Sequence, residues 1–147
     1  MINNFTKDGL RDASIADLED AFGKTIAVGE GSRPGTLSDV LISKRAFRNS
    51  FTLFNSVGHE MMHVAQHYAG LAAYTPFMEY GAYDWNRFIY NFEGISMPKN
   101  WSEAMKGYFN EAIQMNHNWT SGEIKYSPVL ISSYLWQNIG FKFNFAY

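Results

Sequence analysis

VGHEMMHVA, residues 57–65, places two histidines four residues apart inside an apolar run. If this run is helical, residues four apart are offset by about 40° and by about 6 Å along the axis, so His59 and His63 project from one face. Glu60 stands beside them on the rim of that face. Two imidazoles that can share a metal ion, next to a carboxylate that can accept a proton from water, are what zinc-dependent hydrolysis requires. The stretch therefore predicts a helix that carries a catalytic metal site.

The pentapeptide alone allows a plainer interpretation, in which two partly buried histidines flank a solvated glutamate on an amphipathic helix. Two features of the context favour the metal site. An ionised Glu60 in so apolar a helix costs free energy unless it is paired or hydrogen-bonded. Gly58 costs about 1 kcal/mol relative to alanine in a helix, and the close approach of another backbone element or of a substrate would explain its presence.

A catalytic zinc site uses three protein ligands and keeps one open position, so a third ligand should come from a nearby segment. The best candidate is Glu79, sixteen residues after His63. A first helix that ends near Gly70, followed by a reversal through Thr75 and Pro76, would place Glu79 in the first turn of a second helix, against the two histidines. Glu79 could instead be an ordinary acidic residue that favours the N-terminal end of a helix dipole.

Other candidate ligands fit less well. Glu93 lies fourteen residues beyond Glu79, too far along the same helix to serve the same ion. His67 continues the four-residue spacing, but three ligands on one straight helix would spread over about 12 Å. We therefore expect His67 to be a surface residue or a residue that supports a ligand. His117, the last of the four histidines, could return to the site or be a plain surface residue near a helix end.

Residues 57–66, followed by Glu79 and by Ala82 three residues later, resemble the zincin metallopeptidases. They look most like the gluzincin branch, whose third ligand is a glutamate on the following helix. The His-Val-x-Gln ending and the Glu-x-x-Ala spacing are also similar to small HExxH domains at the carboxyl ends of bacterial polymorphic toxins, including Rhs-type proteins. The metzincin branch fits badly, because the positions where it needs a glycine and a histidine hold Gln66 and Ala69. The resemblance covers residues 57–86.

This resemblance implies a zinc metallopeptidase, an enzyme that hydrolyses a protein or peptide substrate. It assigns the zinc ligands to His59, His63 and Glu79 and the general base to Glu60. The candidate oxyanion donors are Tyr83 and His117. It also implies a role as a delivered toxin domain, for which an immunity or inhibitor protein would be the partner.

A non-catalytic module on the same scaffold, which would bind a peptide or glycan, is the alternative. Aromatic residues make up 17% of the chain, and Tyr80, Tyr83 and Trp85 are near enough to Glu79 to line a cleft. A packed aromatic core explains the same composition more simply. The intact Glu60 argues against such a module, because loss of the general base is the simplest way for such an enzyme to lose its catalytic activity.

The 147 residues suit a single domain, residues 1–147, with a substantial core. A net charge of −2 without any basic block does not indicate nucleic-acid binding. Without cysteine, any metal must be held by histidine and carboxylate. No stretch has the apolar length of a signal peptide or of a membrane span. We therefore expect the chain to be cytoplasmic as written, or to be a domain of a larger exported polypeptide.

Residue patterns along the chain predict a mostly helical α+β domain with a small sheet, zincin-like in having an HExxH helix followed by a helix with a glutamate ligand. The predicted helices cover residues 14–23, 50–68, 77–92 and 101–115, and a further one starts at Ser127 and Pro128, with Gly140 beyond its end. Ser14, Asn100 and Ser127 are the expected caps. The predicted strands cover residues 25–28, 40–43 and 141–147.

Overall fold

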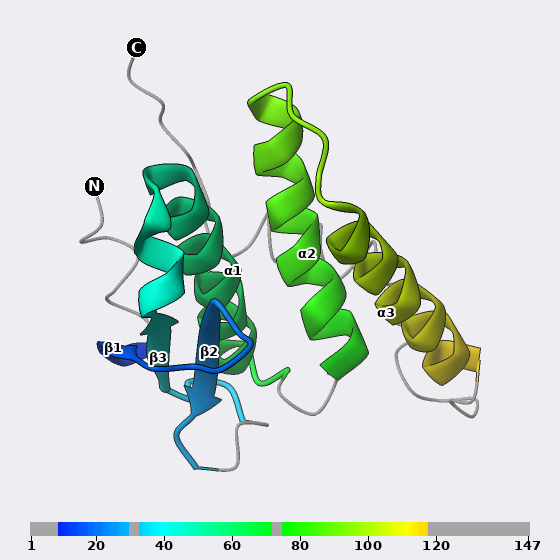
Figure 1. Ribbon diagram of the computed structural model, residues 1–147. Helices are drawn as coiled ribbons and strands as arrows, with labels where there is room; N and C mark the ends of the chain where they lie inside the picture. The colour runs from blue at the N-terminus through cyan, green and yellow to red at the C-terminus, as the bar shows by residue number, and fades with distance from the viewer. Residues whose placement is uncertain (1–8, 30–32, 72–74, 118–147) are drawn as a thin grey trace.

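The computed structural model describes residues 9–29, 33–71 and 75–117, which form a three-stranded sheet and three long helices. The elements, in chain order, are β1 (Leu10–Ala16), β2 (Gly23–Ala27), β3 (Ser38–Ser43), the short 3-10 helix η2 (Lys44–Arg48), α1 (Ser50–Tyr68), α2 (Thr75–Phe92) and α3 (Lys99–His117). α1 packs against both the sheet and α2, and α3 packs against α2 (Figure 1). The mostly helical α+β class is thus confirmed. The helix predicted from Ser127 and the strand predicted over residues 141–147 lie outside the described residues.

The sheet has the strand order β1-β3-β2, with β1 parallel and β2 antiparallel to the central strand β3. Val40 and Ile42 of β3 are buried with Val64 of α1, so the sheet is fixed to this helix by an apolar cluster. β2 is consequently an edge strand that lies against α1. The strands predicted over residues 25–28 and 40–43 are confirmed, with small shifts in their bounds.

The helix predicted over residues 14–23 is wrong. Ser14, Ile15 and Ala16 belong to β1 and pair with β3, and Phe22 accepts a hydrogen bond from the Ser43 amide at 2.9 Å. A serine cap contributes only about 1 kcal/mol to a helix. Pairing with β3 outweighs that local preference, because it satisfies a whole row of backbone groups.

α1 spans the residues predicted for the motif helix. Asn49 caps its start, since the Asn49 side-chain oxygen accepts a hydrogen bond from the Thr52 amide at 2.7 Å. At its end Gly70 adopts a positive φ of 80°, and the Leu71 amide donates to the Gln66 carbonyl at 2.9 Å. This is the Schellman motif, which favours glycine at the left-handed position. It fixes the point at which the chain leaves the motif helix.

α2 begins two residues before the predicted start at residue 77 and ends with the same motif. Gly94 has a φ of 67°, and the Ile95 amide donates to the Tyr90 carbonyl at 2.9 Å. α3 begins at Lys99, so the prediction that Asn100 caps it is wrong. The Pro98 carbonyl accepts hydrogen bonds from the first turn, and Asn100 lies inside that turn.

Gly58 leaves space for a side chain of α2. A Cβ atom on Gly58 would lie 2.0 Å from Nε1 of Trp85 on α2. The close approach anticipated at Gly58 therefore comes from a side chain, not from backbone or substrate. Trp85 is buried with Met62, Ala82 and Ile89, and this cluster packs α2 against α1 at the HExxH motif. Within the described residues, no helix is both long and apolar enough to cross a membrane.

Candidate metal centre

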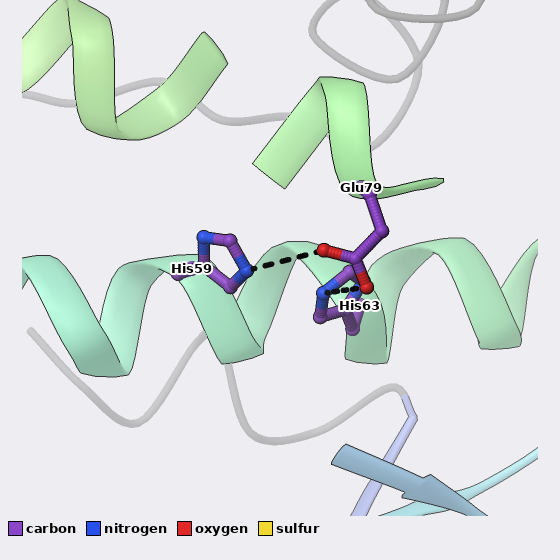
Figure 2. Close-up of side chains that lie close together, drawn as sticks. All are labelled: His59, His63 and Glu79. Atoms are coloured by element: carbon purple, nitrogen blue, oxygen red, sulfur yellow. Dashed lines mark ion pairs between the residues drawn. The ribbon is translucent and has the colours of Figure 1, made fainter. Parts of the chain in front are cut away.

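His59 and His63 of α1 and Glu79 of α2 converge on one point, as Figure 2 shows. The Glu79 carboxylate lies between the imidazoles, with Oε1 3.5 Å from Nε2 of His63 and Oε2 3.8 Å from Nε2 of His59. The three ligand atoms lie within 4.8 Å of one another. Bonds of about 2.0–2.1 Å in a tetrahedral zinc site separate neighbouring donors by about 3.3 Å. The group can therefore hold a metal ion after small side-chain adjustments, and Glu79 is the third member, as predicted.

The ring of His59 is held by an amide of α2. Nδ1 of His59 lies 2.7 Å from Oδ1 of Asn86. The Asn86 amide nitrogen donates to the Asn55 carbonyl at 3.1 Å, so its oxygen must be the acceptor for His59. This network places the His59 proton on Nδ1. The lone pair on Nε2 is then left for a metal ion.

His63 is held in the same way by an amide of its own helix. Nδ1 of His63 donates to Oε1 of Gln66 at 2.8 Å, and Nε2 of Gln66 donates to the Met78 carbonyl at 2.9 Å. Gly81 gives Gln66 its room, because a Cβ atom there would lie 2.9 Å from the Gln66 amide nitrogen. Both histidines are therefore fixed, before any metal binds, in the tautomer that ligates through Nε2.

The pKa shifts of His63 and Glu79 favour the protonation states that bind a cation. Burial lowers the pKa of His63 to about 4, helped by the charge of His59, so His63 is neutral at pH 7. Burial would raise the pKa of Glu79, but its interactions with the two histidines hold the pKa below the usual value. Burial would lower the pKa of His59, but the interaction with Glu79 and the charge of Glu60 raise it. The raised pKa means that a proton competes with a metal ion for Nε2 of His59.

Glu60 lies next to His59 but turns towards the sheet. The Thr25 hydroxyl of β2 donates to Oε2 of Glu60 at 2.7 Å. A Cβ atom on Gly23 would lie only 2.5 Å from Cγ of Glu60. Gly23 and Thr25 are two residues apart on one strand, so they lie on the same face of it, and this face packs against Glu60. Burial raises the pKa of Glu60, and the nearby His59 charge and the Thr25 hydrogen bond partly offset this.

A cavity of about 730 Å³ joins these groups, with walls from β2, α1, α2 and the start of α3. Tyr83 lines it, with its ring edge-on to the His59 ring at 5.0 Å between centroids. Burial and the charge of Glu79 raise the pKa of Tyr83, so the phenol keeps its proton and can act as a donor. His117 is the last residue of α3, and its side chain lies outside the described part of the chain.

Three other residues singled out in the sequence lie elsewhere than at the metal group. His67 lines the cavity but is no surface residue, because it is buried with Nδ1 2.8 Å from the Ser38 hydroxyl. Tyr80 packs against Phe109 of α3, and Trp85 packs against Gly58, so neither lines the cavity.

Sequence reasoning missed the residues that support the site. Gln66 follows His63 by three positions, a helical spacing that could have indicated a contact. Thr25 lies in a predicted strand, but Gly23 was expected to end the helix over residues 14–23, and nothing in either pattern names Glu60 as their partner. Asn86 is twenty-seven residues from His59, and only the packing of α1 on α2 brings them together.

The comparisons with known proteins give no relative. No family model, no curated protein and no solved structure matches this chain.

Proposed function

We propose that the protein is a zinc-dependent metallopeptidase of gluzincin type. The observation that carries the proposal is the separation of roles around α1. Two histidines and Glu79 converge on one point, while Glu60, one residue from His59, is held apart from them by β2. Two imidazole nitrogens and a carboxylate oxygen are a donor set of catalytic zinc sites, and they leave one position open.

The chain's own residues supply the remaining chemistry. Zinc held by the three ligands would polarise the scissile carbonyl and make water more acidic. Glu60 accepts the proton of the attacking water and later passes it to the leaving amine, and its raised pKa suits both steps. Thr25 occupies one carboxylate oxygen, so the other serves as the acceptor. Tyr83, protonated and beside His59, donates to the oxyanion.

The substrate is a protein or peptide that enters the cavity between β2 and the helices. The resemblance of residues 57–86 to polymorphic toxin domains adds a role as a delivered toxin, whose partner would be an immunity or inhibitor protein. Of the three aromatic candidates only Tyr83 lines the cavity, but Phe22 and Trp101 line it as well, so aromatic walls do not distinguish the enzyme from a binding module. The position of the Glu60 carboxylate beside the metal group favours the enzyme over the module.

The test is cleavage of a broad peptide library, followed by mass spectrometry, with the full zinc-loaded chain and its Glu60→Gln variant. The variant keeps the ligands and nearly the same shape, so it should retain zinc while its activity falls by about 10²–10⁴-fold. Equal cleavage patterns for both proteins would assign the activity to another site or to a contaminant. Zinc binding without any cleavage by the wild type would favour the binding module.

A further inference from the structure

Arg45 of η2 lines the same cavity as the metal group, where the wall is formed by η2 and the loop before β2. Two contacts hold its guanidinium in place. Nη1 donates to the Glu19 carbonyl at 2.7 Å, and Cζ lies 5.6 Å from the centre of the Phe22 ring. A cation held in this way loses little side-chain entropy when a ligand binds to it.

Among the described residues, no ion pair neutralises the charge of Arg45. Across residues 9–29, 33–71 and 75–117, no carboxylate lies within ion-pair distance of it. Outside the metal group and Glu60, the acidic side chain that lines the cavity is Asp20, against the two cations Arg45 and Lys24. The guanidinium carries five N–H donors, and the Glu19 carbonyl takes one of them. The others can donate to the two oxygens of a carboxylate side by side.

We propose that Arg45 binds a carboxylate of the substrate, so that the site selects peptides with an acidic side chain or a free C-terminus near the scissile bond. The inference rests on the proposed peptidase function, and it adds the substrate class. The same carboxylate chemistry has two sources in a peptide, the side chains of aspartate and glutamate and the terminal carboxylate. A pair of libraries, one with free and one with amidated C-termini, distinguishes them.

Arg48 offers a matched control. Its Cζ lies 5.3 Å from the centre of the same Phe22 ring, and its Nε donates to the Thr52 hydroxyl at 3.1 Å. Arg48 does not line the cavity. Replacing either arginine by glutamine removes one positive charge and one contact with Phe22, but Arg45→Gln alone changes the cavity wall. A difference between the two variants therefore reports on the cavity.

The experiment measures retention of the two peptide libraries by the full zinc-loaded chain in the Glu60→Gln background. We expect enrichment of acidic peptides, lost by at least about tenfold with Arg45→Gln, as for a charge-assisted hydrogen bond, and kept with Arg48→Gln. Arg45→Lys should restore part of it, because the charge remains but the paired donors do not. Enrichment that disappears on amidation identifies the terminal carboxylate, and enrichment that persists identifies side chains.

Three results would overturn the inference: no preference for acidic peptides, a preference that survives Arg45→Gln, or one that Arg48→Gln abolishes equally. Cleavage by the wild type is scored separately. Acidic peptides retained through Arg45 but never cut would keep Arg45 as the carboxylate-binding residue and overturn the peptidase function. Cleavage without a preference for acidic peptides would support the peptidase function and overturn the role of Arg45. If peptides were neither retained nor cleaved, both proposals would be overturned.

Discussion

α1 faces α2 on one side and the edge strand β2 on another, and the two sides hold their polar groups differently. Towards α2, His59 and His63 are fixed by the neutral amides of Asn86 and Gln66. Towards β2, Glu60 is held by one hydroxyl and by the space that a glycine leaves. Amides lock a tautomer without adding charge, whereas burial against a strand leaves a carboxylate with a raised pKa. Under the proposed function, the α2 side holds the metal and the β2 side moves the proton, so mutations should separate the two roles.

The largest effect is expected on the α2 side, from the ligands themselves. His63→Ala or Glu79→Ala should lower zinc affinity by more than about 100-fold, the upper effect of residues that merely support a ligand. Competition with a chromogenic chelator measures this. His67→Gln is the control, because His67 lies one turn beyond His63 outside the metal group, and it should keep its zinc. A Glu79→Ala protein with wild-type affinity would refute the third ligand.

Gln66→Met should produce the next effect on the same side. Methionine is unbranched and of similar length, so it fills the space but cannot accept the proton of His63 Nδ1. Zinc affinity should fall by about 10–100-fold, as for other residues that orient a metal-bound histidine. The same chelator competition applies. Unchanged affinity would mean that the contact with Gln66 does not orient the ligand.

Thr25→Val tests the β2 side. Valine keeps the shape of threonine but removes the hydroxyl that holds Glu60, so kcat should fall about tenfold, the worth of one net hydrogen bond. Zinc affinity should not change, and Thr25→Ser should restore most of kcat. Steady-state kinetics on a peptide from the library screen, together with the zinc titration, check both parts. Loss of zinc in Thr25→Val would show that the two sides of α1 are not separable.

The smallest effect concerns stability without metal. The folded-state pKa of Glu60 is raised above its ordinary value of 4.5, so its stabilising contribution is complete below pH 4.5 and is lost as the pH rises through the folded-state pKa. Glutamine does not ionise, so the Glu60→Gln variant does not lose this stability as the pH rises. In chelator at pH 7 the variant should be more stable than the wild type by on the order of 1 kcal/mol, and the gap should close near pH 4.5. Urea unfolding at both pH values measures it, and a less stable variant at pH 7 would contradict the buried-carboxylate account.

The α2 side was largely predictable from the sequence, for local reasons. The spacing of His59 and His63 within one helix fixes their shared face. Gly70 and Gly94 mark the ends of α1 and α2, but Thr75 and Pro76, where the reversal was expected, belong to α2, so Glu79 lies beyond the first turn predicted for it. The amide of Asn86 was not predictable, because its contact with His59 depends on how closely two helices pack at Gly58.

The β2 side could not be predicted, because its contacts are distant in sequence. Thr25 is thirty-five residues from Glu60, and a glycine and a threonine in a strand do not reveal what lies opposite them. The same limit explains the error at residues 14–23. A serine followed by acidic residues is typical of a helix start, but the partner strand β3 lies more than twenty residues ahead in the sequence. Pairing between distant segments decided the structure there.

The central claim is that His59, His63 and Glu79 hold one zinc ion. Native mass spectrometry of the full chain, purified without chelator, tests it most directly. We expect one zinc per chain in the wild type and in Glu60→Gln, and none in Glu79→Ala at the same concentration. A wild-type protein that carries no zinc, and that does not bind added zinc tightly, would contradict the account.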